Sequence, residues 1–236
     1  MLALFYCAEN FALEPTLKYD LSGSSKWVPY FMEDSKKPGI LGELVPQILV
    51  KSGVNGQQVM LPAARMVVAL EKGDIDFDLI SPSWFSHQEF TSKYVLSEPL
   101  MPIAEYIVQL ATSANKITKT EDISGRRVGT VRGYYYHNDN DFDRVDFSSE
   151  KQLVQALKSN RISYAIIGDL PAKYWSNQLG VAIDLSVLHS QGYLHIRLRN
   201  EHAPLLNQLN KAIFSLKEAK IVNDVTQKYV KALQTD

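Results

Sequence analysis

The loop Ser81-Pro82-Ser83-Trp84 combines side chains that can bind a polar solute. The hydroxyl groups of Ser81 and Ser83 could hold carboxylate or hydroxyl groups of a ligand, and the indole of Trp84 offers a stacking face. The same residues can also form a plain Ser-Pro turn with the tryptophan packed beneath it. Because the loop directly follows a predicted apolar strand, we favour the binding role.

A second loop runs from Arg132 through Gly133 to Tyr134 and Tyr135 and places a positive charge beside aromatic rings. Arg132 would meet an anionic group, and Gly133 would let the backbone approach a ligand closely. The alternative is a solvated loop whose tyrosines shield a hinge. We expect the binding role here too, without a choice between the two tyrosines.

Three further side chains are candidates for the same site. Trp27 and Tyr30 frame a proline loop after the first predicted strand, where they could wall a cleft or simply cover the end of a sheet. Arg65 lies in the first turn of a predicted helix, where a cation is unfavourable for the helix dipole. An anionic ligand could compensate this charge, and so could a surface carboxylate such as Glu89.

Composition excludes several other chemistries. Basic and acidic residues nearly cancel, 25 against 26, so the chain has no broad electrostatic footprint for nucleic acid. Cys7 is the only cysteine, and the five histidines lack the spacing of metal ligands. The acidic run Asp139 to Asp143 lacks the glycine and terminal glutamate of a calcium loop. We therefore expect neither a metal nor another cofactor.

Two segments, 69–81 and 156–168, align without a gap and indicate a repeated unit. Each begins on the apolar face of a helix and reaches a residue that tolerates positive φ, Gly73 or Asn160. Each continues into a short apolar strand that opens into a loop, where open α/β sheets bind ligands. The repeat predicts two similar lobes whose loops face each other across a cleft; chance is the alternative, because helix–glycine–strand units are common.

The remaining periodicity alternates strands with helices, which favours mostly parallel sheets with right-handed crossovers. Besides the repeat strands, we predict strands at 17–21, 57–61, 101–110, 127–131, 145–147, 183–188 and 192–198. Helices are predicted at 41–53, 63–72, 149–159, 171–179, 203–218 and 221–233. No apolar run is long enough to span a membrane.

Several short motifs, in this order, resemble the type II periplasmic solute-binding proteins of the family-3, polar-amino-acid-like class. They are the aromatic-Pro-Tyr loop, ALEKGDIDFDLI, SKYVLSEPL, EDISGRRVGTVRG and LVQALKSNRISYAII. The resemblance implies an α/β fold of two lobes, each a mostly parallel sheet flanked by helices, with two crossing strands as the hinge. Lobe one would comprise residues 14–104 and 194–236, and lobe two residues 105–193, with crossings near 101–110 and 189–199.

One departure from the family bears on the ligand. Amino-acid binders of this class carry an arginine shortly before the segment that holds Tyr94, and it grips the ligand's α-carboxylate. Here no arginine occurs between Arg65 and Arg126. We therefore expect weak binding of ordinary amino acids and regard Arg65 as the candidate replacement. Asp169 lies within one position of the family's second contact, an acidic residue on lobe two.

The resemblance implies a periplasmic binding protein that is a monomer and not an enzyme. It would capture a small polar or anionic solute between its lobes for uptake through an ABC transporter, with a membrane permease or a receptor as its partner. A ligand-sensing module and a small-carboxylate dehydratase are the alternatives, the latter using His87, Glu89 or Asp169. Residues 1–13 could be the remnant of an export signal or an ordinary apolar leader.

Overall fold

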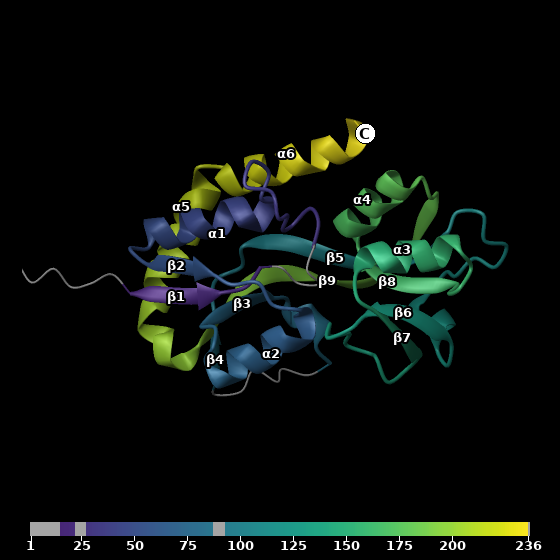
Figure 1. Cartoon of the computed structure of the whole chain (residues 1–236), viewed down its shortest axis with the longest axis horizontal. Coiled ribbons are helices and arrows are strands. Elements are labelled where there is room, and N and C mark those ends of the chain that lie inside the picture. Colours follow the sequence, from purple (N-terminus) through teal and green to yellow (C-terminus); the bar gives the residue numbers. More distant parts are fainter. Residues whose placement is uncertain (1–14, 22–26, 87–92, 236) are drawn as a thin grey trace, which may run out of the picture.

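The computed structural model describes residues 15–21, 27–86 and 93–235. Its strands are linked by hydrogen bonds in the order β2-β1-β3-β9-β5-β8-β6-β7, and β4 pairs with β9 (Figure 1). The strands are β1 (Thr16–Tyr19), β2 (Asn55–Gln58), β3 (Phe77–Ile80), β4 (Tyr94–Leu96), β5 (Met101–Leu110), β6 (Arg127–Val131), β7 (Asp143–Phe147), β8 (Tyr164–Gly168) and β9 (Ile183–Arg199).

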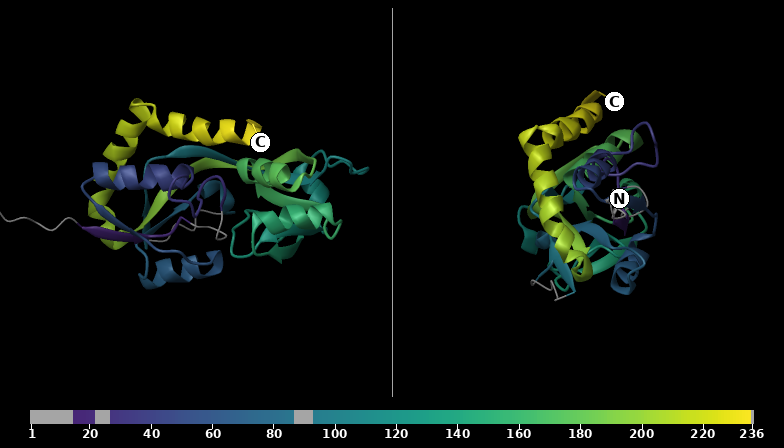
Figure 2. Two further views of the ribbon diagram at one scale, coloured as in Figure 1. Left: turned by 45° about the horizontal axis from the view of Figure 1, so that its top comes forward. Right: turned by 90° about the vertical axis from the view of Figure 1, so that its left-hand side faces the viewer.

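In the first half of the molecule, β1 runs parallel to β2 and β3, and β9 is antiparallel to β3. One face of this sheet is covered by α1 (Ile40–Lys51), α5 (Leu206–Glu218) and α6 (Ile221–Thr235), while α2 (Ala63–Lys72) lies on the opposite face (Figures 1 and 2). The apolar stripe of α1 repeats every three or four residues and is fully buried against the strands. This packing forms the larger of the hydrophobic cores.

In the second half, β6 is parallel to β7 and β8, and β8 is antiparallel to β5. Helices α3 (Glu150–Lys158) and α4 (Asp169–Leu179) cover one face (Figure 1). Alternate residues of β8 enter two separate apolar clusters: Ala165 and Ile167 pack toward the helices, and Tyr164 and Ile166 pack on the other side. Burial on both faces explains why this strand is apolar throughout.

The repeat predicted from the sequence is present in the backbone. Gly73, the residue after α2, and Asn160, the second residue after α3, both adopt positive φ, 82° and 53°. The next N–H group donates to the carbonyl five positions back in each copy, Asp74 to Ala69 at 2.8 Å and Arg161 to Ala156 at 2.9 Å. Both helices therefore end in the same left-handed turn before β3 and β8.

The two long strands β5 and β9 connect the halves. They pair antiparallel from Met101–Leu194 to Leu110–Ile183, with irregular register near Glu105. The C-terminal part of β9 continues past this pairing to join β3 and β4. One strand thus serves both halves, and its side chains can reach any space between them.

Several local predictions differ from the structure. The strand predicted at 57–61 lies at Asn55–Gln58, and the strand Tyr94–Leu96 was not predicted. Residues 183–199 form one strand instead of two, because Ser190 to Gly192, at the expected break, pair with Ile103 to Glu105 of β5. The segment before α5 is a 3₁₀ helix, η3 (Asn200–Leu205), which contains Pro204. Helix α4 begins at Asp169, two residues earlier than predicted, with Gly168 as its N-cap. No helix in the described part of the chain is long and apolar enough to cross a membrane.

Candidate functional site

A cavity of about 70 Å³ lies where the two halves and the long strands meet. The first half contributes Trp27, Met66, Val67, Asp78, Leu79, Ile80 and Trp84 to its wall. The second half contributes Val131, Gly133, Tyr134, Tyr135, Tyr136, Glu150, Ile166, Ile167 and Gly168. Strands β5 and β9 add Ile103, Glu105 and Arg197. A solute held here would touch both halves at once.

The aromatic loop before α1 forms one side of the cavity. The N–H groups of Ile40 and Leu41, at the start of the helix, donate to the carbonyls of Pro29 and Tyr30 at 3.0 and 2.8 Å. These bonds use donors that a helix N-terminus leaves unpaired, and they fasten the loop. Trp27 lines the cavity and packs on the Tyr30 ring, with centroids 4.4 Å apart. Tyr30 itself is buried beneath it and does not line the space.

The serine loop lies next to the aromatic loop. Ser81 Oγ caps the 3₁₀ turn η1 (Pro82–Trp84) by accepting from the Ser83 N–H, and it also contacts the Ser83 hydroxyl at 2.8 Å. Ser81 is fully buried in this role, whereas Ser83 borders a second, more open hollow beside His137. The Trp84 ring lines the main cavity, and its Nε1 is buried without a hydrogen-bond partner among the described residues.

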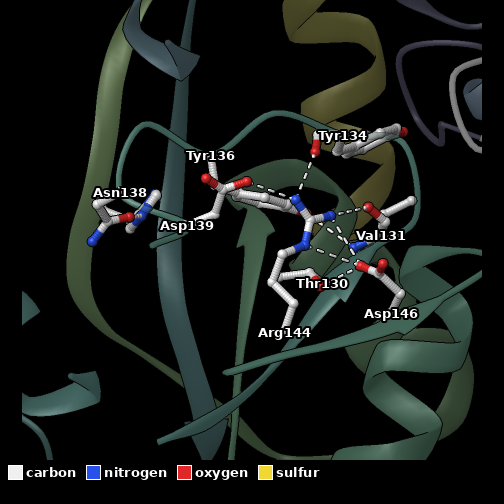
Figure 3. A network of polar contacts seen from close by, with 9 residues as sticks. Thr130, Val131, Tyr134, Tyr136, Asn138, Asp139, Arg144 and Asp146 are labelled. Carbon is white, nitrogen blue, oxygen red and sulfur yellow. Dashed lines mark hydrogen bonds and ion pairs between the residues drawn. The ribbon is translucent and has the colours of Figure 1, made fainter. Parts of the chain in front are cut away.

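The loop that follows β6 and carries Tyr134 to Tyr136, here called the tyrosine loop, is bound by the guanidinium group of Arg144 (Figure 3). Arg144 on β7 donates to the carbonyls of Val131 and Tyr134 at 3.2 and 3.3 Å, and to the carboxylates of Asp139 and Asp146 at 2.8 and 2.9 Å. Asp139, from the acidic run that lacks the pattern of a calcium loop, belongs to this network. Arg144 thereby fixes both ends of the loop that carries the cavity tyrosines.

Tyr135 reaches across to the first half of the molecule. Its ring packs on Phe85, with centroids 4.6 Å apart. Two buried side chains cross the boundary as well, because Val28 joins the core of the second half and Leu170 joins the core of the first. The described conformation therefore has the halves in contact around the cavity.

A buried ion pair in the cavity wall was not predicted from the sequence. Arg197 on β9 donates from Nε and Nη2 to the two carboxylate oxygens of Asp78 on β3, at 2.9 and 2.6 Å. Burial acts to lower the pKa of Arg197, but the Asp78 charge outweighs it and raises that pKa above its usual value. The sequence did contain a signal for this pair. Asp78 is a charged residue inside the apolar run Phe77–Ile80 of a buried strand, and such a residue requires a partner.

A second polar group, around Glu105 on β5, was also missed. Its Oε2 accepts a hydrogen bond from Ser190 Oγ at 2.7 Å and lies 3.8 Å from His189 Nδ1. His189 Nε2 contacts Asn138 Oδ1 at 2.7 Å. The His137 ring packs on His189 with centroids 4.5 Å apart, and burial together with this neighbour lowers the pKa of His137. His137 is therefore neutral at neutral pH.

Six predicted ligand residues do not line the main cavity: besides Tyr30, Ser81 and Ser83, these are Arg65, Arg132 and Asp169. Arg65 on α2 and Arg132 after β6 have exposed side chains, although their neighbours Met66 and Gly133 line the wall. Asp169 is the first residue of α4, where the backbone N–H groups of the helix start and Lys173, at 3.9 Å, surround its carboxylate. Burial raises the pKa of Asp169 above its usual value. The nominated His87 and Glu89 lie outside the described residues, as does the segment 1–13.

One group of potential metal ligands lies away from the cavity. Oxygen and nitrogen atoms of Asp76, Glu201 and His202 fall within 4.8 Å of one another. His202 Nε2 is 2.9 Å from Asp76 Oδ1, and Glu201 is bonded to Arg199 at 3.0 Å. These contacts form a polar cluster on the first half of the molecule, away from the cavity wall.

No protein-family model matches the chain, and a search of curated proteins finds no match. Solved structures do match it along nearly its whole length. A mutant of ArgBP from T. maritima has a TM-score of 0.75 at 20% identity, covering 92% of this chain and 95% of that one. An ABC uptake transporter substrate-binding protein from Streptococcus pneumoniae with bound histidine has a TM-score of 0.71 at 18% identity, covering 91% and 92%. An ancestral amino acid-binding protein, a precursor of cyclohexadienyl dehydratase, has a TM-score of 0.72 at 20% identity, covering 91% and 95%.

These structures define the class of fold. The chain has the type II periplasmic-binding-protein-like fold predicted from its sequence, and the structures that it resembles are amino-acid-binding proteins of the kind indicated by its motifs. The fold prediction and the resemblance are therefore confirmed. At such low identities the likeness establishes the fold, so the solute has to be argued from the cavity itself.

Proposed function

We propose that this chain is a periplasmic solute-binding protein that encloses a small polar solute between two lobes and presents it to the permease of an ABC transporter. The observation that carries the proposal is the composition of the cavity wall. Trp27, Asp78 and Trp84 come from the first half, and Gly133 and Tyr134 from the second. A solute that touches both walls stabilises the closed arrangement, and closure is a signal that a membrane partner can read.

The proposal includes the lobe boundaries expected from the sequence, residues 14–104 with 194–236 and residues 105–193. Strands β5 and β9 pass between these parts and are the proposed hinge. Flexing there would separate Tyr135 from Phe85, whose rings are in contact. The protein would act as a monomer, since one chain supplies both walls.

Of the two solute classes expected from the sequence, the proposal retains the polar one. The anionic class depended on Arg65 and Arg132, and both have exposed side chains outside the cavity wall. Binding without catalysis is the simpler reading, because Asp169, the one described residue nominated for acid–base chemistry, also lies outside that wall. Most of the similar solved structures are binding proteins, although one is a precursor of a dehydratase.

A thermal-shift screen over amino acids, amines, organic acids and sugars tests the function, because a ligand that binds only the native state raises the melting temperature. Small-angle scattering with and without each hit then tests closure, and we expect the radius of gyration to decrease. A hit that leaves the radius unchanged, or binding that survives removal of both the Trp84 and Tyr135 rings, would contradict a site between the lobes.

A further inference from the structure

The charges in the cavity wall do not balance. Besides tyrosines, its ionisable side chains are Asp78, Glu105, Glu150 and Arg197, three carboxylates against one guanidinium. Asp78 and Arg197 neutralise each other through their two-point contact. The described wall contains no lysine or histidine. Glu150 accepts a hydrogen bond from the Tyr134 hydroxyl at 2.9 Å, so the negative charge argued here for a solute is that of Glu105.

Glu105 is the centre of this negative charge. It is 7% exposed, and its only ion-pair neighbour among the described residues is His189 at 3.8 Å. His189 Nε2 contacts Asn138 Oδ1 at 2.7 Å, and its Nδ1 has no hydrogen-bond partner among the described residues, so the ring makes no hydrogen bond to Glu105. The Ser190 hydroxyl donates to Oε2 of Glu105, and Oε1 of Glu105 accepts no hydrogen bond from the described residues. A buried carboxylate of this kind is costly unless a cation compensates it.

Aromatic faces surround the same space. Trp27 and Trp84 line it from one half, in edge-to-face contact with centroids 6.2 Å apart. Tyr135 lines it from the other half and is held in place by Phe85. The negative face of an aromatic ring attracts ammonium groups, most strongly when water is excluded. Rings and carboxylate together select a positive charge over a neutral or negative one.

The geometry points to a small organic cation, a protonated amine or a quaternary ammonium, as the solute that this cavity recognises, with Glu105 as its specificity-determining residue. This inference rests on the proposed function. A free carboxylate on the solute adds nothing to recognition here, because the Arg197 charge is already matched by Asp78. The expected solute thus differs from an α-amino acid because it needs no free carboxylate.

Five probes test the charge preference by calorimetry. Four have similar chain lengths: 1,4-diaminobutane, 1,4-butanediol, succinate and the amino acid L-glutamine. The fifth, tetramethylammonium, is a quaternary ammonium ion. We expect diaminobutane or tetramethylammonium to bind and the other three to bind at least about 30-fold more weakly, the scale for an uncompensated buried charge. Added potassium chloride should weaken binding of the cation.

A matched pair of variants assigns the preference to one residue. Glu105→Gln keeps the size of the side chain and removes its charge, and we expect it to lower cation affinity by about 30-fold or more. Glu98→Gln makes the same change at an exposed residue outside the cavity wall and should bind like the wild type. If Glu105→Gln fails to fold, the comparison of diaminobutane with butanediol on the wild type decides alone.

The possible failures are distinguishable. Tight binding of succinate or glutamine, with no binding of either cation, would overturn the cation inference and leave solute binding intact. Equal binding of diaminobutane by the wild type and Glu105→Gln would also overturn it. If none of the five probes binds, the cation inference fails, and the wider thermal-shift screen still tests the proposed function separately.

Discussion

Asp78 and Arg197 form a two-point ion pair inside the cavity wall, with nitrogen–oxygen distances of 2.9 and 2.6 Å. The two residues lie opposite each other on antiparallel strands β3 and β9. The Asp78 side chain is fully buried and that of Arg197 is 8% exposed. The Arg197 guanidinium also lies over the Tyr94 ring, 5.2 Å from its centroid. This pair joins β3, in the first half of the molecule, to the strand that continues into the second half.

Asp78→Asn should destabilise the protein strongly. The substitution leaves the Arg197 charge buried and uncompensated, a change that typically costs about 3–5 kcal/mol. Denaturant unfolding measures the loss. The control is Asp184→Asn, which removes an ion pair to Lys116 whose side chains are 43% exposed on both sides, and should cost at most about 1 kcal/mol. Similar losses of stability in the two variants would contradict the assignment of Asp78 as the partner that compensates the buried Arg197 charge.

Arg144→Lys should loosen the tyrosine loop while leaving the fold intact. A lysine ammonium cannot reproduce the fork that binds two carbonyls and two carboxylates together (Figure 3). We expect amide hydrogen exchange over residues 132–139 to accelerate by about tenfold or more, since the loop opens locally at lower cost. Arg127→Lys, at an exposed position on the adjacent strand β6, should leave that exchange unchanged.

The hydrogen-bond network around Arg144 should also contribute to stability in a pH-dependent way, through Asp146. Burial alone would raise the pKa of Asp146, but the Thr130 hydroxyl at 2.7 Å and the Arg144 guanidinium outweigh it and hold that pKa below the usual 3.8. The folded state therefore binds this proton less readily than the unfolded chain. The resulting stabilisation is present above pH 3.8 and is lost as the pH falls through the lower folded-state pKa.

Unfolding experiments between pH 7 and pH 2 on wild type and Asp146→Asn check this expectation. The variant should be less stable than the wild type at neutral pH, and the difference should shrink only below pH 3.8. Thr130→Val, which removes one of the hydrogen bonds, should give a smaller difference of the same sign. A gap that stays constant down to pH 2 would show that the carboxylate is not held in its charged form.

The fold was predictable from the sequence because its signals are local. Gly73 and Asn160 mark helix ends that require positive φ, and β5 has the bounds that its alternation predicts. The continuity of β9 was not predictable, since it depends on pairing with β5, about ninety positions earlier in the chain. An isolated glycine in a strand pattern, such as Gly192, indicates a close backbone approach, and here two serines lie where a side chain would be.

The candidate site was predictable only in part. Loops that follow predicted strands indicated Trp84, Gly133, Tyr134 and Tyr135, and all four line the cavity. Their role in binding remains a prediction. Glu105 was missed because its meaning depends on pairing between β5 and β9, which periodicity does not reveal. Arg65 was expected to face the cleft because no other arginine occurs before Arg126, but Met66 lines the wall in its place.

Gly192→Ala should destabilise the protein and disturb the serine loop. A Cβ atom at this position would lie 2.7 Å from Ser81 Oγ and 2.9 Å from Ser83 Oγ, so the loop would have to move away from β9. Overpacking of this kind typically costs about 1–3 kcal/mol. Because Trp84 belongs to the same turn, its fluorescence should shift along with the lower unfolding midpoint. Gln191→Ala, at the exposed neighbouring position, should keep the wild-type unfolding midpoint and the wild-type Trp84 fluorescence. Wild-type stability in Gly192→Ala would mean that the serine loop is not fixed against β9 and cannot hold Trp84 at the cavity.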